Sequence, residues 1–401
     1  MRCLSAGPIC FLERSFMSAI VLPRAIRIGA GALLELPAAL AQQGLSAPAI
    51  LTDAFLAGNG ALDRLLAILA EAGMAARAYN EVVPDPTVAS VDAAVRFVAE
   101  GKHDCIIGFG GGSPIDTAKA VAVLSLHGGT MRERKAPYQE NRPGLPIVAI
   151  PTTAGTGSEA TRFTIITDDA NEEKMLCAGL AYMPLLAIVD YELTLSKPVR
   201  LTADTGIDAL THAIEAYVSK HANPFTDGMA LSALRLIWPN LRRVCEEPGD
   251  RAAREAMMVG SLQAGIAFSN ASVALVHGMS RPIGAHFHVA HGLSNAMLLP
   301  AVTAWSASGA LHRYADCARA MGIDHAGEGE QAAVARLVNA LREVNRDLTV
   351  PSPKSYGIDE ARWTELLPLM AEQALESGSP GNNPRIPDAQ DIQALYREAW
   401  A

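Results

Sequence analysis

Between residues 17 and 197, short runs of apolar and β-branched residues alternate with longer stretches in which apolar positions recur at helical spacing. This alternation, with glycine-rich turns between the runs, predicts an α/β domain. The predicted helices include Thr87–Glu100 and Pro114–Leu126. The predicted strands are Ala47–Thr52, Ala76–Val82, Asp104–Phe109, Leu145–Ile150, Arg162–Thr167 and Leu185–Val189.

The pattern changes after Lys197-Pro198, where strand-like runs stop. From Thr202 onward the chain is rich in alanine and leucine at helical spacing, which predicts an all-helical domain. Prolines are expected to break its helices, because a proline removes a backbone donor and clashes with the preceding turn; they are Pro224, Pro239, Pro248, Pro300, Pro351 and Pro353. We therefore expect an N-terminal extension at 1–16, which is a candidate disordered arm, an α/β domain at 17–197 and a helical domain at 198–401.

Composition narrows the classes of function. The chain has 401 residues, half of them hydrophobic, which is enough for about two to three domains with a full core. A net charge of −9 argues against electrostatic binding to nucleic acid or to an anionic membrane. No apolar run reaches the roughly 18 residues that are needed to span a membrane. The six cysteines are scattered without a Cys-x-x-Cys pair, which favours free thiols and a cytoplasmic location.

A glycine turn between a strand and a helix is the first candidate binding element. In the run 105–119, Gly110–Gly112 let backbone N–H groups approach a bulky anion, because no Cβ blocks the way. Ser113 is expected at the N-cap, Pro114 at the first helical position and Asp116 in a capping box. The free amides and positive end of such a helix would bind a pyrophosphate; the alternative is a tight turn without a ligand.

Two further segments could contact a dinucleotide. The loop 150–159 follows a strand and offers hydroxyls from Thr152, Thr153, Thr156 and Ser158, which could line a ribose or diphosphate or simply form a polar connection. Asp53 follows another strand, where a carboxylate can accept from both ribose hydroxyls and favours NAD over NADP, although acidic residues are also common in turns. An earlier Gly29-Ala-Gly31 lacks a third glycine and is interpreted as a turn.

Carboxylate and imidazole side chains in the helical region suggest a metal site. Asp208 and His212 are four residues apart, so on a helix they share one face at about 5–6 Å between Cβ atoms. Further along lie His277, His286, His288 and His291. This mixture of oxygen and nitrogen ligands suits Fe²⁺ or Zn²⁺ better than Mg²⁺ or Ca²⁺, while each histidine alone could equally be a hydrogen-bonded core residue.

Taken together, the motifs identify a resemblance. The runs GGGSPIDTAK (110–119), PTTAGTGSE (151–159), GIDALTHAIEAY (206–217) and VHGM…AHG (276–292) resemble the signatures of iron-containing (group III) alcohol dehydrogenases, in the family's order. The resemblance implies a Rossmann-like, dinucleotide-binding α/β domain followed by an all-helical metal-binding domain, the architecture of dehydroquinate synthase. It implies hydride transfer between a small alcohol or diol and NAD, with Fe²⁺ or Zn²⁺ as second cofactor, and a homo-oligomer, preferably a dimer.

The family's site residues carry over by motif position. They place the metal ligands at Asp208, His212, His277 and His291, with His286 and His288 outside the ligand set. The implied NAD contacts are Asp53, Gly111, Gly112, Ser113, Thr152 and Thr153. The resemblance also suggests a partly apolar substrate pocket lined by Phe163 and Phe268.

One position departs from the family. Many members carry a histidine four residues after the third ligand, proposed to assist proton transfer, and here that position is Arg281. Arginine cannot act as a base at neutral pH, so a relay would run through water, ribose hydroxyls or His288. Arg281 could instead hold an anionic group on the substrate, or form an internal salt bridge.

These observations leave three alternatives to a simple alcohol dehydrogenase. The first is a dehydrogenase of a small hydroxy acid that uses Arg281 as the anion anchor. The second is a catalytically silent NAD- or metal-binding module. The third is a dehydroquinate-synthase-like cyclase, whose Glu/His/His metal set fits the Asp-x-x-x-His helix less well.

Overall fold

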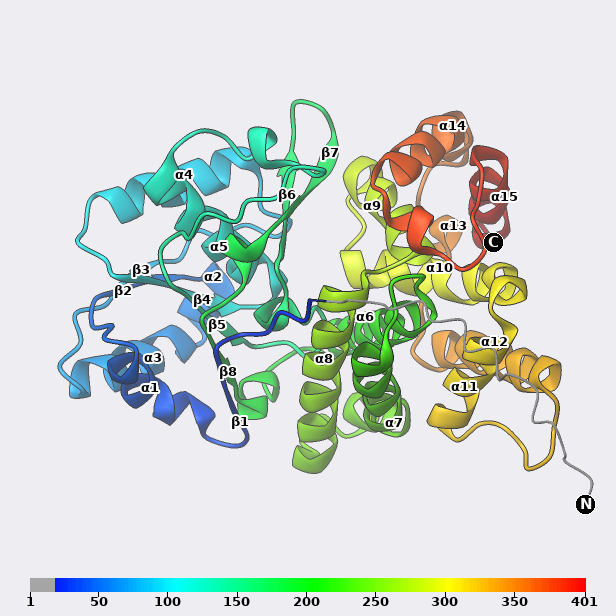
Figure 1. The fold of residues 1–401 in the computed structure, drawn as a ribbon, viewed down its shortest axis with the longest axis horizontal. Coiled ribbons are helices and arrows are strands. Elements are labelled where there is room, and N and C mark those ends of the chain that lie inside the picture. The colour runs from blue at the N-terminus through cyan, green and yellow to red at the C-terminus, as the bar shows by residue number, and fades with distance from the viewer. Residues whose placement is uncertain (1–18) are drawn as a thin grey trace, which may run out of the picture.

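The computed structural model describes residues 19–401, so the predicted extension at 1–16 lies outside the described residues. An α/β half and a helical half lie side by side along the long axis of the molecule (Figure 1). Their junction falls between β8 (Leu186–Val189) and the helix α6 (Val199–Val218). The fold class predicted from the sequence is confirmed.

The α/β half is built on a six-stranded sheet with the order β1-β8-β5-β4-β2-β3, in which every pairing is parallel. Its other strands are β1 (Ala25–Ile28), β2 (Pro48–Leu51), β3 (Arg77–Tyr79), β4 (Cys105–Gly110) and β5 (Ile147–Pro151). The helices of this half are α1 (Leu36–Gln42), α2 (Ala54–Gly58), α3 (Ala61–Glu71), α4 (Val88–Ala99) and α5 (Gly112–His127).

Helices cover both faces of the sheet. On β4, Ile106 packs into the apolar cluster formed with α4 and α5, whereas its neighbour Ile107 packs into the cluster formed with α1 and α3. This alternation of side chains along a strand explains why the central strands are apolar at nearly every position. Ligands of such open sheets bind at the carboxyl ends of the strands, where the chain order reverses.

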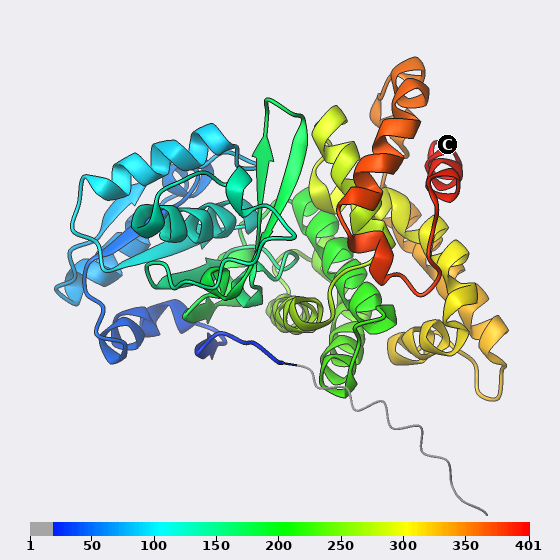
Figure 2. The same cartoon turned by 45° about the horizontal axis from the view of Figure 1, so that its top comes forward.

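Five of the six predicted strands lie in this sheet, and the sixth does not. The predicted strand Arg162–Thr167 is β6 (Phe163–Asp168), which pairs in antiparallel fashion with the unpredicted β7 (Glu173–Ala178). The short edge strand β1 was also not predicted, because four residues carry little periodic signal. The β6–β7 hairpin stands at the junction of the two halves, beside α9 (Leu275–Phe287) (Figures 1 and 2).

The helical half contains no strand among the described residues. Besides α6 and α9 its helices are α7 (Pro224–Glu246), α8 (Arg251–Ala271), α10 (His291–Ser306), α11 (Leu311–Met321), α12 (Glu330–Asp347), α13 (Pro353–Tyr356), α14 (Glu360–Glu376) and α15 (Ala389–Ala399).

Two prolines do not break helices as expected from the sequence. Pro239 lies inside α7 and Pro300 inside α10. In α7, Leu234, Ile237 and Leu241 are fully buried on both sides of the proline. Burial of such side chains contributes roughly 1.5–3 kcal/mol each, which outweighs the roughly 3 kcal/mol cost of an internal proline.

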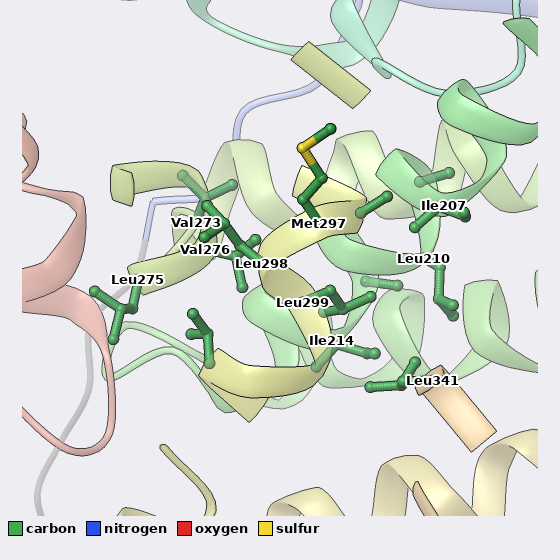
Figure 3. Packing of buried hydrophobic residues seen from close by; sticks show 14 of the residues in the cluster. Ile207, Leu210, Ile214, Val273, Leu275, Val276, Met297, Leu298, Leu299 and Leu341 are labelled. Carbon is green, nitrogen blue, oxygen red and sulfur yellow. The ribbon is translucent and has the colours of Figure 1, made fainter. Parts of the chain in front are cut away.

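Helix α6 forms the centre of the helical core. Ile207, Leu210 and Ile214 of α6 pack close to Leu299 of α10 and Leu341 of α12, all fully buried or nearly so (Figure 3). Neighbours α7, α8 and α10 surround α6, so nearly all of its residues from Thr202 to Val218 are buried. Polar side chains on such a helix are held in fixed positions by packing.

No single helix of residues 19–401 has both the length and the apolar character to cross a membrane, whereas α8 and α9 together, bent by 101°, meet both criteria. Most residues of these two helices are buried within the helical half.

Candidate metal centre and nucleotide-binding loops

The four predicted metal ligands lie together. Asp208 and His212 come from α6, His277 from α9, and His291 is the first residue of α10; one ligand atom from each lies within 4.8 Å of all the others. Oδ1 of Asp208 is 3.9 Å from Nδ1 of His212, 3.6 Å from Nε2 of His277 and 3.8 Å from Nε2 of His291. A carboxylate and three imidazoles at this spacing fit one divalent cation.

A buried carboxylate fixes the third histidine. Oε2 of Glu215 lies 2.6 Å from Nδ1 of His277, and the same carboxylate accepts from the backbone N–H groups of Ala274 and Val276. The contact places the proton on Nδ1 of His277 and leaves its Nε2 lone pair facing Asp208. A carboxylate behind a ligating histidine is the usual way in which proteins orient such a ligand.

Burial keeps two of the imidazoles neutral. Desolvation lowers the pKa of His212 to about 3 and that of His291 to about 4. Burial by itself raises the pKa of Asp208, but the neighbouring imidazoles outweigh it and hold that pKa below its usual value. His212 and His291 are therefore neutral at neutral pH, as metal ligation requires. Burial by itself lowers the pKa of His277, but hydrogen bonds to Asp208 and Glu215 outweigh it and raise that pKa, so a cation would have to displace a proton from this imidazole.

Two residues of this cluster were missed in the sequence. The buried Asn295 donates from Nδ2 to Oδ1 of Asp208 at 2.7 Å, and Nδ2 also lies 3.1 Å from Nε2 of His277. Glu215 follows His212 by three residues and Asn295 follows His291 by four. Helical spacing from the ligands could have identified both, since side chains three or four apart share a helix face.

Aromatic side chains close one side of the cluster. Phe268 stacks on the ring of His212 with centroids 4.2 Å apart, and Phe163 lies beyond it at 6.5 Å. On the other side, the carbonyl of Gly155 lies 3.3 Å from Nδ1 of His212. A Cβ on Gly155 would lie 2.5 Å from the side chain of Thr205, so only glycine lets this loop reach α6.

The glycine turn lies at the carboxyl end of the central strand β4. Helix α5 begins at Gly112, and its N-cap is Gly111. The prediction that Ser113 is the N-cap and Pro114 the first helical residue is therefore wrong. The extended backbone of Gly111 lets the helix start earlier, and Oγ of Ser113 instead accepts from the backbone N–H of Asp85. Gly110 has φ +155°, and a Cβ there would lie 2.4 Å from Pro114.

The predicted capping role of Asp116 is also wrong. Its carboxylate accepts from Oγ of Ser158 at 2.6 Å and from the backbone N–H of Ile165 at 2.8 Å. The buried Lys119, one turn further along α5, donates to Ser158, Thr161 and the carbonyl of Phe163. Desolvation lowers the pKa of Lys119 to about 8. These contacts fasten the glycine turn to the loop 151–161, which also reaches the metal cluster.

The remaining predicted NAD contacts lie at the same edge of the sheet. Thr152 and Thr153 follow β5, and Asp53 follows β2, so all three are at carboxyl ends of parallel strands. Thr153 is the nearest neighbour of Gly111 across the turn. Asp53 caps α2 by accepting from the N–H of Leu56, and the buried Lys197 is close enough for the two charges to interact. The buried hydroxyl of Thr152 has no partner among the described residues.

The two residues proposed for catalysis lie in different surroundings. Arg281 is on α9, one turn after His277, and its side chain is partly buried, with Nη1 fully buried. His288 directly follows α9 in a left-handed conformation with φ +54°, and its side chain is exposed. The neighbouring His286 is turned away from the cluster and lies 2.8 Å from the side-chain oxygen of Gln373.

Comparison with known proteins agrees with the fold and the geometry. The family model described as iron-containing alcohol dehydrogenase matches residues 23–191, and the model of the C-terminal part of that family matches residues 202–400. The chain therefore belongs to the iron-containing alcohol dehydrogenase family, and as such it is an enzyme that acts on CH–OH groups.

Individual relatives cover nearly the whole chain. The NAD-dependent methanol dehydrogenase of Bacillus methanolicus is 36% identical over 96% of this chain and 100% of its own length. The long-chain-alcohol dehydrogenase 1 of Geobacillus thermodenitrificans is 40% identical over 80% and 82%. The crystal structure of a 1,3-propanediol oxidoreductase superposes with a TM-score of 0.92 at 34% identity, covering 96% of this chain and all of that one. These matches favour the dehydrogenase interpretation over the cyclase.

Proposed function

We propose that the protein is an NAD-linked dehydrogenase of small alcohols or diols that carries Fe²⁺, or alternatively Zn²⁺, on Asp208, His212, His277 and His291. The observation that supports this most strongly is the buried cluster of one carboxylate and three imidazoles next to the loop 151–161. That loop also borders the glycine turn, so one segment joins the candidate nucleotide site to the candidate metal centre. The family description, iron-containing, favours Fe²⁺ although the ligand set accepts either metal.

NAD is preferred over NADP in this proposal for two reasons. Asp53 stands where the ribose hydroxyls would bind, and its carboxylate would repel a 2′-phosphate. The methanol dehydrogenase relative is also named as NAD-dependent. The nucleotide contacts would come from Gly111, Gly112, Ser113, Thr152 and Thr153, whose amides and hydroxyls surround the N-terminus of α5.

When bound, the cation supplies a Lewis acid for the alcohol oxygen and the nicotinamide supplies the hydride-accepting group. The chain's own part is to position these groups. Glu215 holds the proton of His277 on Nδ1, so that Nε2 stays an acceptor. Phe268 and Phe163 keep water from one side of the cluster. Arg281 cannot accept a proton, so we propose that the hydroxyl proton leaves by water, ribose hydroxyls or His288.

The proposal is tested on freshly purified protein. Elemental analysis should find one iron or zinc per chain, and oxidation of ethanol, 1-propanol or 1,3-propanediol should form NADH faster than NADPH. Chelation should abolish turnover, and Fe²⁺ or Zn²⁺ should restore it. Turnover that survives complete removal of metal would contradict the proposal.

We further propose a cytoplasmic homodimer. The described cysteines Cys105, Cys177, Cys245 and Cys317 are free thiols, which is typical of a reducing compartment. The outer edge of β1 has no partner strand within residues 19–401, and Ile28 at its end is 48% exposed, so this edge can pair with a second copy. Light scattering after gel filtration tests the oligomer, and cell fractionation tests the location.

A further inference from the structure

The side chain of Arg281 is a partly buried cation that forms no ion pair among the described residues. Among residues 19–401, its Nη1 has no hydrogen-bond partner, and the predicted alternative of an internal salt bridge is wrong. Glu215, the carboxylate that acts on it electrostatically, is already bonded to His277 and to backbone amides. Burial lowers the pKa of Arg281 to about 10, so it stays charged at neutral pH. A guanidinium nitrogen that is buried without a hydrogen-bond partner is unfavourable, which points to a missing partner.

Arg281 lines a cavity of about 350 Å³. The walls come from the β6–β7 hairpin, α9 and α14, and include Lys135, Lys174, Leu176 and Pro282. A cavity of this size at the junction of two domains has the volume of a small-molecule site. The hairpin and α9 stand next to each other in both views of the molecule (Figures 1 and 2).

Within this wall, the other cations already have carboxylate partners. Lys135 pairs with Glu173, and Lys174, only 5% exposed, pairs with Asp85 at 2.8 Å. Three further carboxylates of the wall, Glu172, Glu372 and Glu376, are at exposed positions. Among residues 19–401, Arg281 is therefore the one basic residue of this wall without an ion-pair partner, which fits a ligand with a single negative charge.

The cavity is lined by the same helix that carries the metal ligand His277. Arg281 follows His277 by one helical turn, so their Cβ atoms lie roughly 5–6 Å apart on the same face of α9. Lys174 also packs against α9: the ammonium group of Lys174 is so close to Gly284 that a Cβ on this glycine would lie 2.7 Å from Nζ. The charge of Lys174 also contributes to the lowered pKa of His291. The cavity wall and the candidate metal centre therefore share α9, at positions one helical turn apart.

We propose that Arg281 binds the anionic end of the substrate, so that the preferred substrates are short hydroxy acids and the corresponding aldehyde acids. A carboxylate can accept two parallel N–H bonds from the guanidinium, which fixes its orientation as well as its position. The inference rests on the proposed function. The reaction is unchanged by it: the carbinol carbon gives a hydride to NAD⁺, the hydroxyl gives a proton to solvent, and the carboxylate stays intact.

The test compares 3-hydroxypropionate with 1-propanol, which differ at the end remote from the hydroxyl. The unaltered enzyme should show the higher kcat/KM with the acid. Arg281→Met should lower kcat/KM for the acid by about 10–150-fold, the range for hydrogen bonds to a charged group, mainly through KM, and should change 1-propanol oxidation little. Glycolate with ethanol and 4-hydroxybutyrate with 1-butanol extend the comparison to shorter and longer chains.

Two control variants separate a specific contact from general effects. Lys135→Met removes a cation that lines the same cavity but already pairs with Glu173, so the ratio of acid to alcohol should stay within about twofold. Arg281→Lys keeps the charge but loses the paired hydrogen bonds, so its ratio should fall between those of the unaltered enzyme and Arg281→Met. Thermal denaturation should show Arg281→Met at least as stable as the unaltered enzyme, because the variant loses a buried guanidinium nitrogen that has no hydrogen-bond partner.

A binding measurement distinguishes failure of this inference from failure of the proposed function. Calorimetric titration of the metal-loaded enzyme with NAD⁺ and propionate should show binding that is lost in Arg281→Met and kept in Lys135→Met. If propionate binds all three equally, or if every acid is a poorer substrate than its neutral counterpart, Arg281 is not an anion site. If no alcohol or acid is oxidised but propionate binding still depends on Arg281, the proposed function fails and the anion site stands.

Discussion

The two candidate sites of this molecule are built in opposite ways. The nucleotide-binding loops use backbone amides and small side chains that are close together in the sequence, at Gly110–Gly112 and in the loop 151–161. The metal cluster uses charged or basic side chains from three helices, with Asp208 and His291 far apart in the sequence. A site that binds through backbone amides requires small residues, because larger side chains would block the ligand. A site that binds through side chains requires further residues that hold those side chains in place.

This difference determines how each site should fail. In the metal cluster, Glu215 and Asn295 hold the ligands by hydrogen bonds. A substitution of either residue should therefore lower the affinity of the cluster for metal. In the glycine turn, the main requirement is space for the ligand. A small added group should therefore lower the affinity for the nucleotide without lowering the stability of the protein. The predictions below test this contrast, from the largest expected effect to the smallest.

Loss of a metal ligand should have the largest effect. His277→Ala should release the metal and lower kcat/KM for alcohols about a thousandfold or more, because a bound cation contributes several kcal/mol to catalysis. NAD binding, measured by fluorescence titration, should be unchanged. His286→Ala is the matched control, since His286 bonds to Gln373 outside the cluster and should retain metal. A His277→Ala enzyme that keeps its metal and activity would show that the ligand set is wrong.

Removal of the charge behind His277 should have the next largest effect. Glu215→Gln should weaken metal affinity by about 10–100-fold, the usual range for the partner of a ligating histidine. Metal affinity is measured by competition with a chelator. Asp316→Asn is the control. The carboxylate of Asp316 accepts from the hydroxyl of Tyr217, which is on α6 like Glu215, but it does not bond to the cluster. This variant should therefore leave the metal affinity unchanged. Equal affinity in Glu215→Gln would mean that packing alone orients His277.

A single methyl group should weaken the nucleotide site. A Cβ on Gly111 would meet Thr153 at 3.5 Å, an ordinary contact, and the residue has φ −75°. Gly111→Ala should therefore fold normally, yet bind NAD about tenfold more weakly, because the methyl group blocks the approach of the diphosphate. Gly228→Ala adds a methyl group in open space on α7 and should bind NAD normally. Unchanged NAD affinity in Gly111→Ala would place the diphosphate elsewhere.

The smallest effect concerns a buried carboxylate of the α/β half that serves structure alone. Hydrogen bonds from Arg142 lower the pKa of Glu140 from 4.5 to about 2. A lowered pKa in the folded state stabilises the protein above the unfolded value of 4.5, and the contribution is lost as the pH falls towards 2. Because Arg142 is largely exposed, we expect the contribution to be on the order of 1 kcal/mol.

Urea denaturation tests this expectation. Glu140→Gln should be less stable than the unaltered protein near neutral pH, and the difference should shrink at about pH 3. Catalytic activity near neutral pH should be unchanged, in contrast to Glu215→Gln. A stability difference that does not depend on pH would show that the charge of Glu140 is not what stabilises this segment.

The sequence by itself determined the α/β half followed by a helical half, the glycine turn after a strand, and a pair of ligands on one helix. These are short-range features: the alternation of apolar residues fixes the strands, and a spacing of four places Asp208 and His212 on one face of α6. The helix start at Gly112 and the internal prolines were predicted wrongly, because there packing and backbone conformation outweigh local preference.

Only the tertiary structure decided which distant side chains meet. It brought His277 and His291 to α6, placed Glu215 behind His277, and moved the predicted strand of β6 out of the parallel sheet into a hairpin beside α9. It also argues against an internal salt bridge of Arg281, since the lack of a partner for Nη1 among residues 19–401 becomes evident only when the neighbours of α9 are in place. Contacts between residues far apart in the chain depend on how whole elements pack, and local periodicity carries no record of that packing.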